Sequence, residues 1–327
     1  MHVLFLDQNK WIDLARVHAG KTTSGPHLLV YQELLDAVRA EELIAPLTVS
    51  HILETSKRND PESRKKVVEV QALLSKGFAF RSRKARLLIE MRNALSKAFG
   101  ESTEQLPANW TVVPGFMQAF EMFDALVASP EDAAVSRFLN HHVDLQTQYV
   151  DYMMNQDDGR RRAAHATFAN DSKQLISQIE ARRKVMDGST IDLRWRAYAA
   201  RLFVDHQSLI THMLNVVGHT VDEMKELGGE AIVKFIQDVP TLNVEAELAV
   251  RLELKTGPLK VNDIQDMHSF CTAIPYASRI VAERGFISLA RQAKLDNRYN
   301  VSLSTDVGEL QGMYRSLHSR AERPQAY

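Results

Sequence analysis

The stretch that most constrains the fold is residues 2–17, which reads HVLFLDQNKWIDLARV. The short apolar run 2–6 ends abruptly at Asp7, after which apolar residues recur at helical spacing at Trp11, Ile12 and Leu14. A buried strand therefore delivers a carboxylate to its C-terminal end, which is where open α/β sheets place their chemistry. The alternative explanation for Asp7 is a structural one, since an isolated Asp before a helix commonly caps it.

The same alternation of short apolar runs and helical periods returns near both ends of the chain. It predicts helices at 27–40, 49–57, 60–77, 262–273 and 286–295, with Thr48, Asp60 and Asn262 at helix starts and Asp306 in a capping box. It predicts strands at 2–6, 43–47, 78–80, 278–282 and 299–303. This order predicts an α/β fold with a parallel sheet of about five strands flanked by helices.

Between residues 81 and 255 only long helical periodicities occur, divided by prolines and glycines. We interpret this segment as a large α-helical insertion. The α/β core then consists of residues 1–80 and 256–327, and the insertion of residues 81–255. Basic clusters such as Arg160 to Arg162 belong to the insertion, and a charge run on a helix is commonly just a solvated face.

Composition narrows the class of protein. A hydrophobic content of 45% supports a sizeable core, and a net charge of -1 gives no overall attraction to nucleic acid, so any such binding must come from local patches. The single cysteine, Cys271, excludes an internal disulfide and a cysteine zinc cage and fits a reducing cytoplasm. No apolar run reaches the ~18 residues that span a bilayer, so we expect a cytoplasmic protein without a membrane partner.

Several carboxylates fall at predicted strand ends or on the helices that follow. Each has an ordinary structural explanation by itself, but together they share the carboxyl edge of a parallel sheet: Asp7, Glu54, Asp263, Asp266 and Glu283. Acids gathered this closely raise one another's pKa, and divalent cations relieve that repulsion. Hard oxygen ligands without a cysteine favour Mg²⁺ or Mn²⁺, which in pairs can activate water for phosphodiester hydrolysis.

These motifs resemble the PIN-domain nucleases. VLFLDQN, with Asp7 and Asn9, looks like the family's first motif, and LIAPLTVSHILET, with Glu54, looks like the second strand and its acidic helix. DIQDMHSFCTAIPYASRIVAE is similar to the third block of PIN-like proteins that carry helical insertions. The spacing from Asp266 to Glu283 favours Asp266 over Asp263 as the third ligand, although both share a helix face.

The resemblance covers roughly residues 1–80 and 256–310, and it departs from the family at one site position. Glu283 stands where Asp is usual, after Ala282 where Thr or Ser is frequent, so Glu283 is the least secure ligand.

The resemblance implies a metal-dependent endonuclease, with RNA a more probable substrate than DNA. Asp7, Glu54 and Asp266 would hold Mg²⁺ or Mn²⁺, Glu283 would complete the pocket, and an activated water would attack a phosphodiester. Asn9 would orient Asp7 or touch substrate. The predicted phosphate contacts, which position a backbone without reading its sequence, are Lys10, Lys57, Arg58, Arg279 and Arg284.

Three alternatives stay open. A phosphatase of the Asp-x-Asp type loses weight because Asn9 occupies the second acidic position. A HEPN-type ribonuclease is suggested by Arg160 to His165 and Arg201 to His206, a pattern short enough to arise by chance. A catalytically inactive PIN-like module for binding or assembly is the third. By resemblance, a nuclease of this kind fits bacterial toxins and phage defence, with a regulatory protein partner or a homo-oligomer restraining it.

Overall fold

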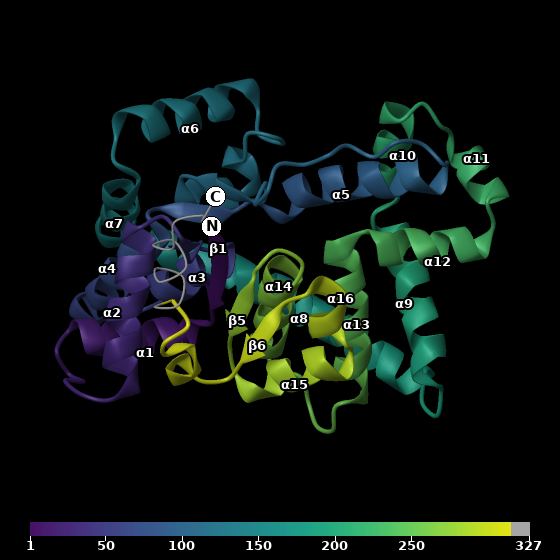
Figure 1. Ribbon diagram of the computed structural model, residues 1–327. Helices are drawn as coiled ribbons and strands as arrows, with labels where there is room; N and C mark the ends of the chain where they lie inside the picture. The colour runs from purple at the N-terminus through teal and green to yellow at the C-terminus, as the bar shows by residue number, and fades with distance from the viewer. Residues whose placement is uncertain (315–327) are drawn as a thin grey trace, which may run out of the picture.

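The computed structural model describes residues 1–314, apart from the side chain of His165. The predicted core segment 256–327 therefore extends beyond the described residues by its last thirteen positions. The fold is mostly helical around a small parallel sheet, as predicted at the level of α/β class (Figure 1). Within the described chain, no helix is both long enough and apolar enough to cross a membrane.

Four parallel strands form the central sheet in the order β2-β1-β5-β6. β1 is central and pairs with β2 at one side and with β5 at the other, in the register Leu4 to Arg279 and Leu6 to Val281. The strands are β1 His2–Leu6, β2 Leu43–Ile44, β5 Arg279–Val281 and β6 Ser302–Ser304. Because all four run the same way, the residues after them meet at one edge of the sheet.

The fifth predicted strand forms, but not as a member of this sheet. β3 (Phe78–Phe80) pairs antiparallel with β4 (Val112–Pro114), which lies in the segment expected to be helical. β3 still touches the end of the second predicted strand, because Phe80 N donates to Leu47 O at 2.8 Å across a parallel bridge. The prediction of a single five-stranded sheet was therefore wrong by one strand.

β1 separates two hydrophobic cores. Its alternate side chains Val3 and Phe5 face one core, while Leu4 and Leu6 face the other, as period-two geometry requires. The helices that contribute buried side chains to the Leu4 side are α1 Gln8–His18, α2 Pro26–Arg39, α4 Pro61–Ser75 and α7 Leu145–Asn155. Those on the Val3 side include α5 Arg83–Ala98, α13 Pro240–Leu254 and α14 Val261–Ala273. Both faces of the sheet are thus covered, as a parallel sheet needs.

The remaining elements connect and cover this frame. They are α3 Val49–Ser56, η1 Phe116–Ala119, η2 Glu121–Phe123, α6 Pro130–His142, α8 Asp158–Val185, α9 Ile191–Asp205, α10 Gln207–Val216, α11 Val221–Glu226, α12 Gly229–Asp238, α15 Arg284–Gln292, α16 Leu295–Tyr299 and η3 Val307–Leu310. The segment 81–255 is mostly helical, as expected, and its α7 lies against α4 while α13 and α8 lie against α14. Its division from the core as a separate unit remains a prediction.

Arg86 is a buried link between the two parts of the chain. The residue is 2% exposed, and its guanidinium donates from α5 to Thr241 Oγ1 at 3.0 Å, to Cys271 O at 3.2 Å and to Thr272 Oγ1 at 2.9 Å. These acceptors belong to α13 and α14. The first helix of the predicted insertion is therefore fixed to a helix of the predicted core.

Most predicted helix starts are confirmed. Thr48 caps α3, Asp60 caps α4, and Asp306 caps η3 through a capping box. α14 begins one residue early, with Lys260 at the cap position and Asn262 already helical, because the side chain of Asp263 accepts from Lys260 N at 2.7 Å. The last strand also begins later than predicted, since α16 occupies 295–299 and ends in a left-handed residue, Asn300.

Candidate active site

Asp7 has both of the roles that the sequence left open. It follows β1 at the carboxyl edge and caps α1, where its Oδ1 accepts from Gln8 N at 2.7 Å. It also accepts from the backbone N–H of Glu283. Burial, reinforced by the charge of Glu283, raises the pKa of Asp7 against the lowering effects of Gln8 N and Lys10.

Glu54 lies on α3 and is half-buried. Burial raises the pKa of its carboxyl to about 7, with further contributions from the charges of Asp7 and Glu283 and an opposing one from Lys57. An ordinary Glu side chain is fully ionised at neutral pH. Glu54 therefore shares an electrostatic environment with two of the other predicted ligands.

Asp266 shows the strongest form of the same effect. Burial raises the pKa of this half-buried carboxyl on α14 to about 8, and the charges of Asp7, Glu54 and Glu283 each raise it further. These four carboxyl groups, Asp7, Glu54, Asp266 and Glu283, are called the carboxylate cluster below. Residues separated by up to 276 positions are thus brought to one edge of the sheet.

Glu283 is the exposed member of the cluster and follows β5 as the N-cap residue of α15. Its Oε1 accepts a short hydrogen bond from Nδ2 of Asn9. Asn9 was expected to orient Asp7 or to touch substrate, whereas the structure bonds it to Glu283. The carboxamide therefore ties the exposed acid to the first turn of α1.

Asp263, the alternative third ligand, has hydrogen-bond partners outside the carboxylate cluster. Its carboxylate accepts from Lys255 Nζ at 2.6 Å and from Lys260 N at 2.7 Å, so it caps α14 within an ion pair. Its charge contributes the smallest of the named effects on the pKa of Asp266. The structure therefore favours Asp266 over Asp263 as a cluster member.

The donor atoms of this cluster suit a metal ion, but their present arrangement does not. Its donors are all carboxylate oxygens, the set that Mg²⁺ and Mn²⁺ prefer. Yet in residues 1–314 no group of three or more His, Cys, Asp or Glu side chains is arranged so that it could hold a metal ion as it stands. Side chains that repel one another must move closer to share an ion, and neutralising that repulsion is what a divalent cation would supply.

The predicted basic contacts divide into those near the cluster and one far from it. Lys10 and Lys57 lie close enough to lower the pKa of Asp7 and Glu54, respectively. Arg58 follows α3, and Arg284 is exposed at the first position of α15. Arg279 was expected beside the site, but it begins β5 and lines a cavity with His2 and Tyr314. Arg279 lies at the amino edge of the sheet, because the first and last residues of a strand lie at opposite edges of the sheet.

A buried polar chain that the sequence did not reveal holds α3 beside α1. Gln8 Nε2 donates to Thr55 Oγ1 at 3.0 Å, and the Thr55 hydroxyl donates to Gln71 Oε1 at 3.2 Å. Tyr149 donates to the same oxygen at 2.7 Å. Gln8 and Thr55 directly adjoin Asp7 and Glu54, so this chain fixes the two backbones that carry those acids. The sequence contained one signal for this chain, since a polar residue directly follows each of the two candidate ligands.

In the described part of the chain, the arginines and histidines of the HEPN-type alternative do not form a common site. Arg160 pairs with Asp157 at 3.2 Å, and the side chain of His165 lies outside the described residues. Arg201 pairs with Asp205 at 3.0 Å, whereas His206 faces Arg83 Nη2 at 3.4 Å. Burial and the charge of Arg83 lower the pKa of His206.

No protein-family model, no curated protein and no solved structure matches this chain. Any functional conclusion therefore depends on the geometry and charge of the site together with the motifs quoted above.

Proposed function

We propose that the protein is a metal-dependent nuclease that hydrolyses phosphodiester bonds, with RNA the first candidate substrate. The observation that carries this proposal is the carboxylate cluster, in which Glu54 and Asp266 have their pKa values raised to about 7 and about 8 by burial and by the other acids. A fold does not keep such a cluster for stability, because each ionised member opposes the others.

Asp7, Glu54, Asp266 and Glu283 would hold the ion, Mg²⁺ or Mn²⁺. Such an ion supplies a nucleophile at neutral pH and neutralises charge at a phosphate. The chain's own groups supply the positioning. Gln8 N and the backbone N–H of Glu283 fix Asp7, and Asn9 restrains Glu283. The choice of RNA follows from the resemblance to PIN-domain nucleases.

The direct test is cleavage of labelled RNA and single-stranded DNA by the purified protein with Mg²⁺, with Mn²⁺ and with EDTA. Asp7→Asn and Asp266→Asn should each lower the metal-dependent rate at least about a hundredfold, because each removes a ligand charge. Asp36→Asn is the matched control, since Asp36 is an exposed acid whose ion pair, among residues 1–314, is with Arg39 at 3.1 Å. Equal rates in the wild type and both cluster variants would refute the proposal.

A second readout separates metal binding from cleavage. Mn²⁺ at a hundred times its dissociation constant should stabilise the wild type by about 2.7 kcal/mol, measured as a rise in the melting temperature. The same addition should leave Asp266→Asn nearly unchanged. Stabilisation of both proteins to the same extent would place the ion elsewhere.

The inactive PIN-like binding module remains the second candidate. It is favoured by the finding that no described group of side chains is arranged to hold a metal ion as it stands. Oligonucleotide binding without metal-dependent cleavage and without stabilisation by Mn²⁺ would support this candidate over the nuclease.

A further inference from the structure

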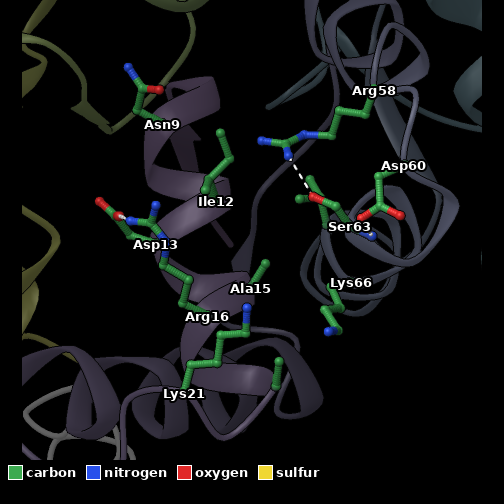
Figure 2. Close-up of a pocket in the computed structure, with 12 residues that line it drawn as sticks. Asn9, Ile12, Asp13, Ala15, Arg16, Lys21, Arg58, Asp60, Ser63 and Lys66 are labelled. Carbon is green, nitrogen blue, oxygen red and sulfur yellow. Dashed lines mark hydrogen bonds and ion pairs between the residues drawn. The ribbon is translucent and has the colours of Figure 1, made fainter.

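A cavity of about 550 Å³ opens beside the carboxylate cluster, between α1 and α4 (Figure 2). Asn9, which bonds to Glu283, lines its end nearest the cluster. Its apolar lining residues include Ile12, Ala15 and Val67. We call this cavity the α1/α4 groove. No prediction from the sequence included this cavity, and among its lining residues only Asn9 and Arg58 were predicted to contact substrate.

Basic side chains from both walls line the groove. Arg16 and Lys21 come from α1 and the turn after it, and Arg58 and Lys66 come from the opposite wall (Figure 2). Arg58 is held in place by donating to Ser63 Oγ at 2.9 Å. Burial and the charge of Arg16 lower the pKa of Arg58, so these two cations repel each other across the cavity.

The acids of the groove pair with only one of these four cations, Arg16, among the described residues. Asp13 pairs with Arg16 at 3.0 Å, and Asp60 caps α4 by accepting from Ser63 N at 3.0 Å. Within residues 1–314, no carboxylate lies within ion-pair distance of Lys21, Arg58 or Lys66. The groove therefore carries an excess of positive charge that an anion would balance.

A second basic cavity flanks the same loop. It holds about 240 Å³ and is lined by Ser56, Lys57, Asn59, Asp158, Arg161 and Arg162. Arg161 is 5% exposed and donates to Ser56 O at 2.5 Å and to Arg58 O at 3.1 Å, while its buried Nε has no hydrogen-bond partner among the described residues. The loop that carries Lys57 and Arg58 thus has cations on both sides, and one buried donor is left unsatisfied.

We propose that the α1/α4 groove binds the sugar-phosphate backbone of a single nucleic-acid strand that extends away from the carboxylate cluster. A cavity of about 550 Å³ has the size of a small-molecule site, so it admits one strand and excludes a duplex. No aromatic side chain lines it, so bases have no stacking surface there. Contacts from Lys21, Arg58 and Lys66 to phosphates position a strand without reading its sequence.

The proposal rests on the nuclease function above, and its test uses binding in place of cleavage. The probes are fluorescein-labelled single-stranded RNA and DNA of mixed sequence and the corresponding duplex, titrated by anisotropy in EDTA over a range of salt concentrations. Lys66→Ala and Arg58→Ala should each weaken binding of both single strands roughly threefold to tenfold and reduce the salt slope by about 0.7 to 1.

The chain offers close controls for these variants. Lys65→Ala removes the neighbouring charge on the same helix, and Lys65 pairs with Glu69 at 4.0 Å outside the groove. Arg16→Ala is a further groove variant, and Arg39→Ala is its matched control, because both arginines pair with an acid three residues earlier, at 3.0 Å and 3.1 Å. Only the groove variants should weaken binding.

Each outcome separates this proposal from the proposed function. Groove variants that bind as the wild type does would overturn the groove, as would a wild type that prefers the duplex or binds no oligonucleotide. In each of these three cases, stabilisation of the wild type by Mn²⁺ would still support the metal site. Loss of strand binding in Lys66→Ala and Arg58→Ala, with the response to Mn²⁺ retained, supports the groove independently of cleavage.

Discussion

At the scale of single residues, Asp266 combines a carboxyl group with surroundings that oppose its ionisation. Burial and four neighbouring acids raise its pKa to about 8 from an ordinary value of 3.8. As pH rises, the unfolded chain therefore releases this proton before the folded chain does. The contribution of Asp266 to the free energy of unfolding is lost progressively between these two pKa values.

Asp266→Asn removes that pH dependence. Without added metal, the variant should match the wild type near pH 4, where Asp266 is protonated in the folded state, and should gain about 1 to 3 kcal/mol by about pH 9. Urea unfolding in EDTA at both pH values measures the difference. Asp36→Asn should show no comparable gain, and a destabilised Asp266→Asn at high pH would contradict the assignment.

Asp7, Glu54 and Glu283 were predictable because each ends a recognisable apolar run or lies on the helix that follows one, whereas Asp266 was chosen through the resemblance by its spacing to Glu283. Asp7, Glu54, Asp266 and Glu283 do come to one edge, and Asp263 turns instead to Lys255 and Lys260. The basic groove was missed, although its α1 wall repeats at helical spacing through Asn9, Ile12, Asp13 and Arg16. From the sequence alone, a polar stripe on a helix is interpreted as a solvent-exposed face, because the sequence does not show that α4 lies opposite it.

At the scale of elements, α3 carries Glu54 on only eight residues, so its ends decide its position. Thr48 Oγ1 accepts from His51 N at 3.3 Å, and His51 Nδ1 accepts from Thr48 N at 3.2 Å. His51 in turn stacks on Phe5 of β1 with ring centroids 5.1 Å apart. This capping box therefore anchors α3 directly to the strand that carries Asp7.

Thr48→Ala should cost about 1 kcal/mol of stability and should also weaken Mn²⁺ binding, because the first turn of α3 loses its anchor. Thr48→Ser, which keeps the hydroxyl, should restore both properties. Calorimetric titration with Mn²⁺ and urea unfolding provide the two measurements. Stability that falls while Mn²⁺ affinity stays unchanged would limit the cap to a structural role.

Elements with strong local signals were predictable, and those that depend on distant partners were not. The apolar run 2–6 and the Thr48 cap are local, and both are confirmed. β4 is three residues long and exists because β3 lies beside it, a pairing that no local period reports. The shortening of the second strand to Leu43–Ile44 has the same cause, since Leu47 turns toward β3.

At the scale of the whole molecule, helices from the segment 81–255 complete both cores. Tyr149 of α7 is buried with Leu4 and Leu6, and Trp195 of α9 belongs to the core that contains Phe5. Arg86 adds hydrogen bonds from α5 to α13 and α14. Removing this segment would expose part of both hydrophobic cores to water.

We therefore expect one cooperative unfolding transition for the described body of the chain. Trp11 reports on the predicted core and Trp195 on the predicted insertion, both from buried positions. Single-tryptophan variants that retain one or the other, with Phe in place of the remaining tryptophans, should give coincident urea transitions. Two separated midpoints would show that residues 81–255 unfold as an independent domain.

The central position of β1 also has a consequence for biosynthesis. Its partner β5 is about 275 residues later in the chain, so a growing chain carries Asp7 long before Asp266 and Glu283 exist. Loop closure over that length is slow compared with local helix formation. A ribosome-bound chain therefore lacks half of the carboxylate cluster until residue 283 has been made, and until then the proposed nuclease would stay inactive beside the RNA that encodes it.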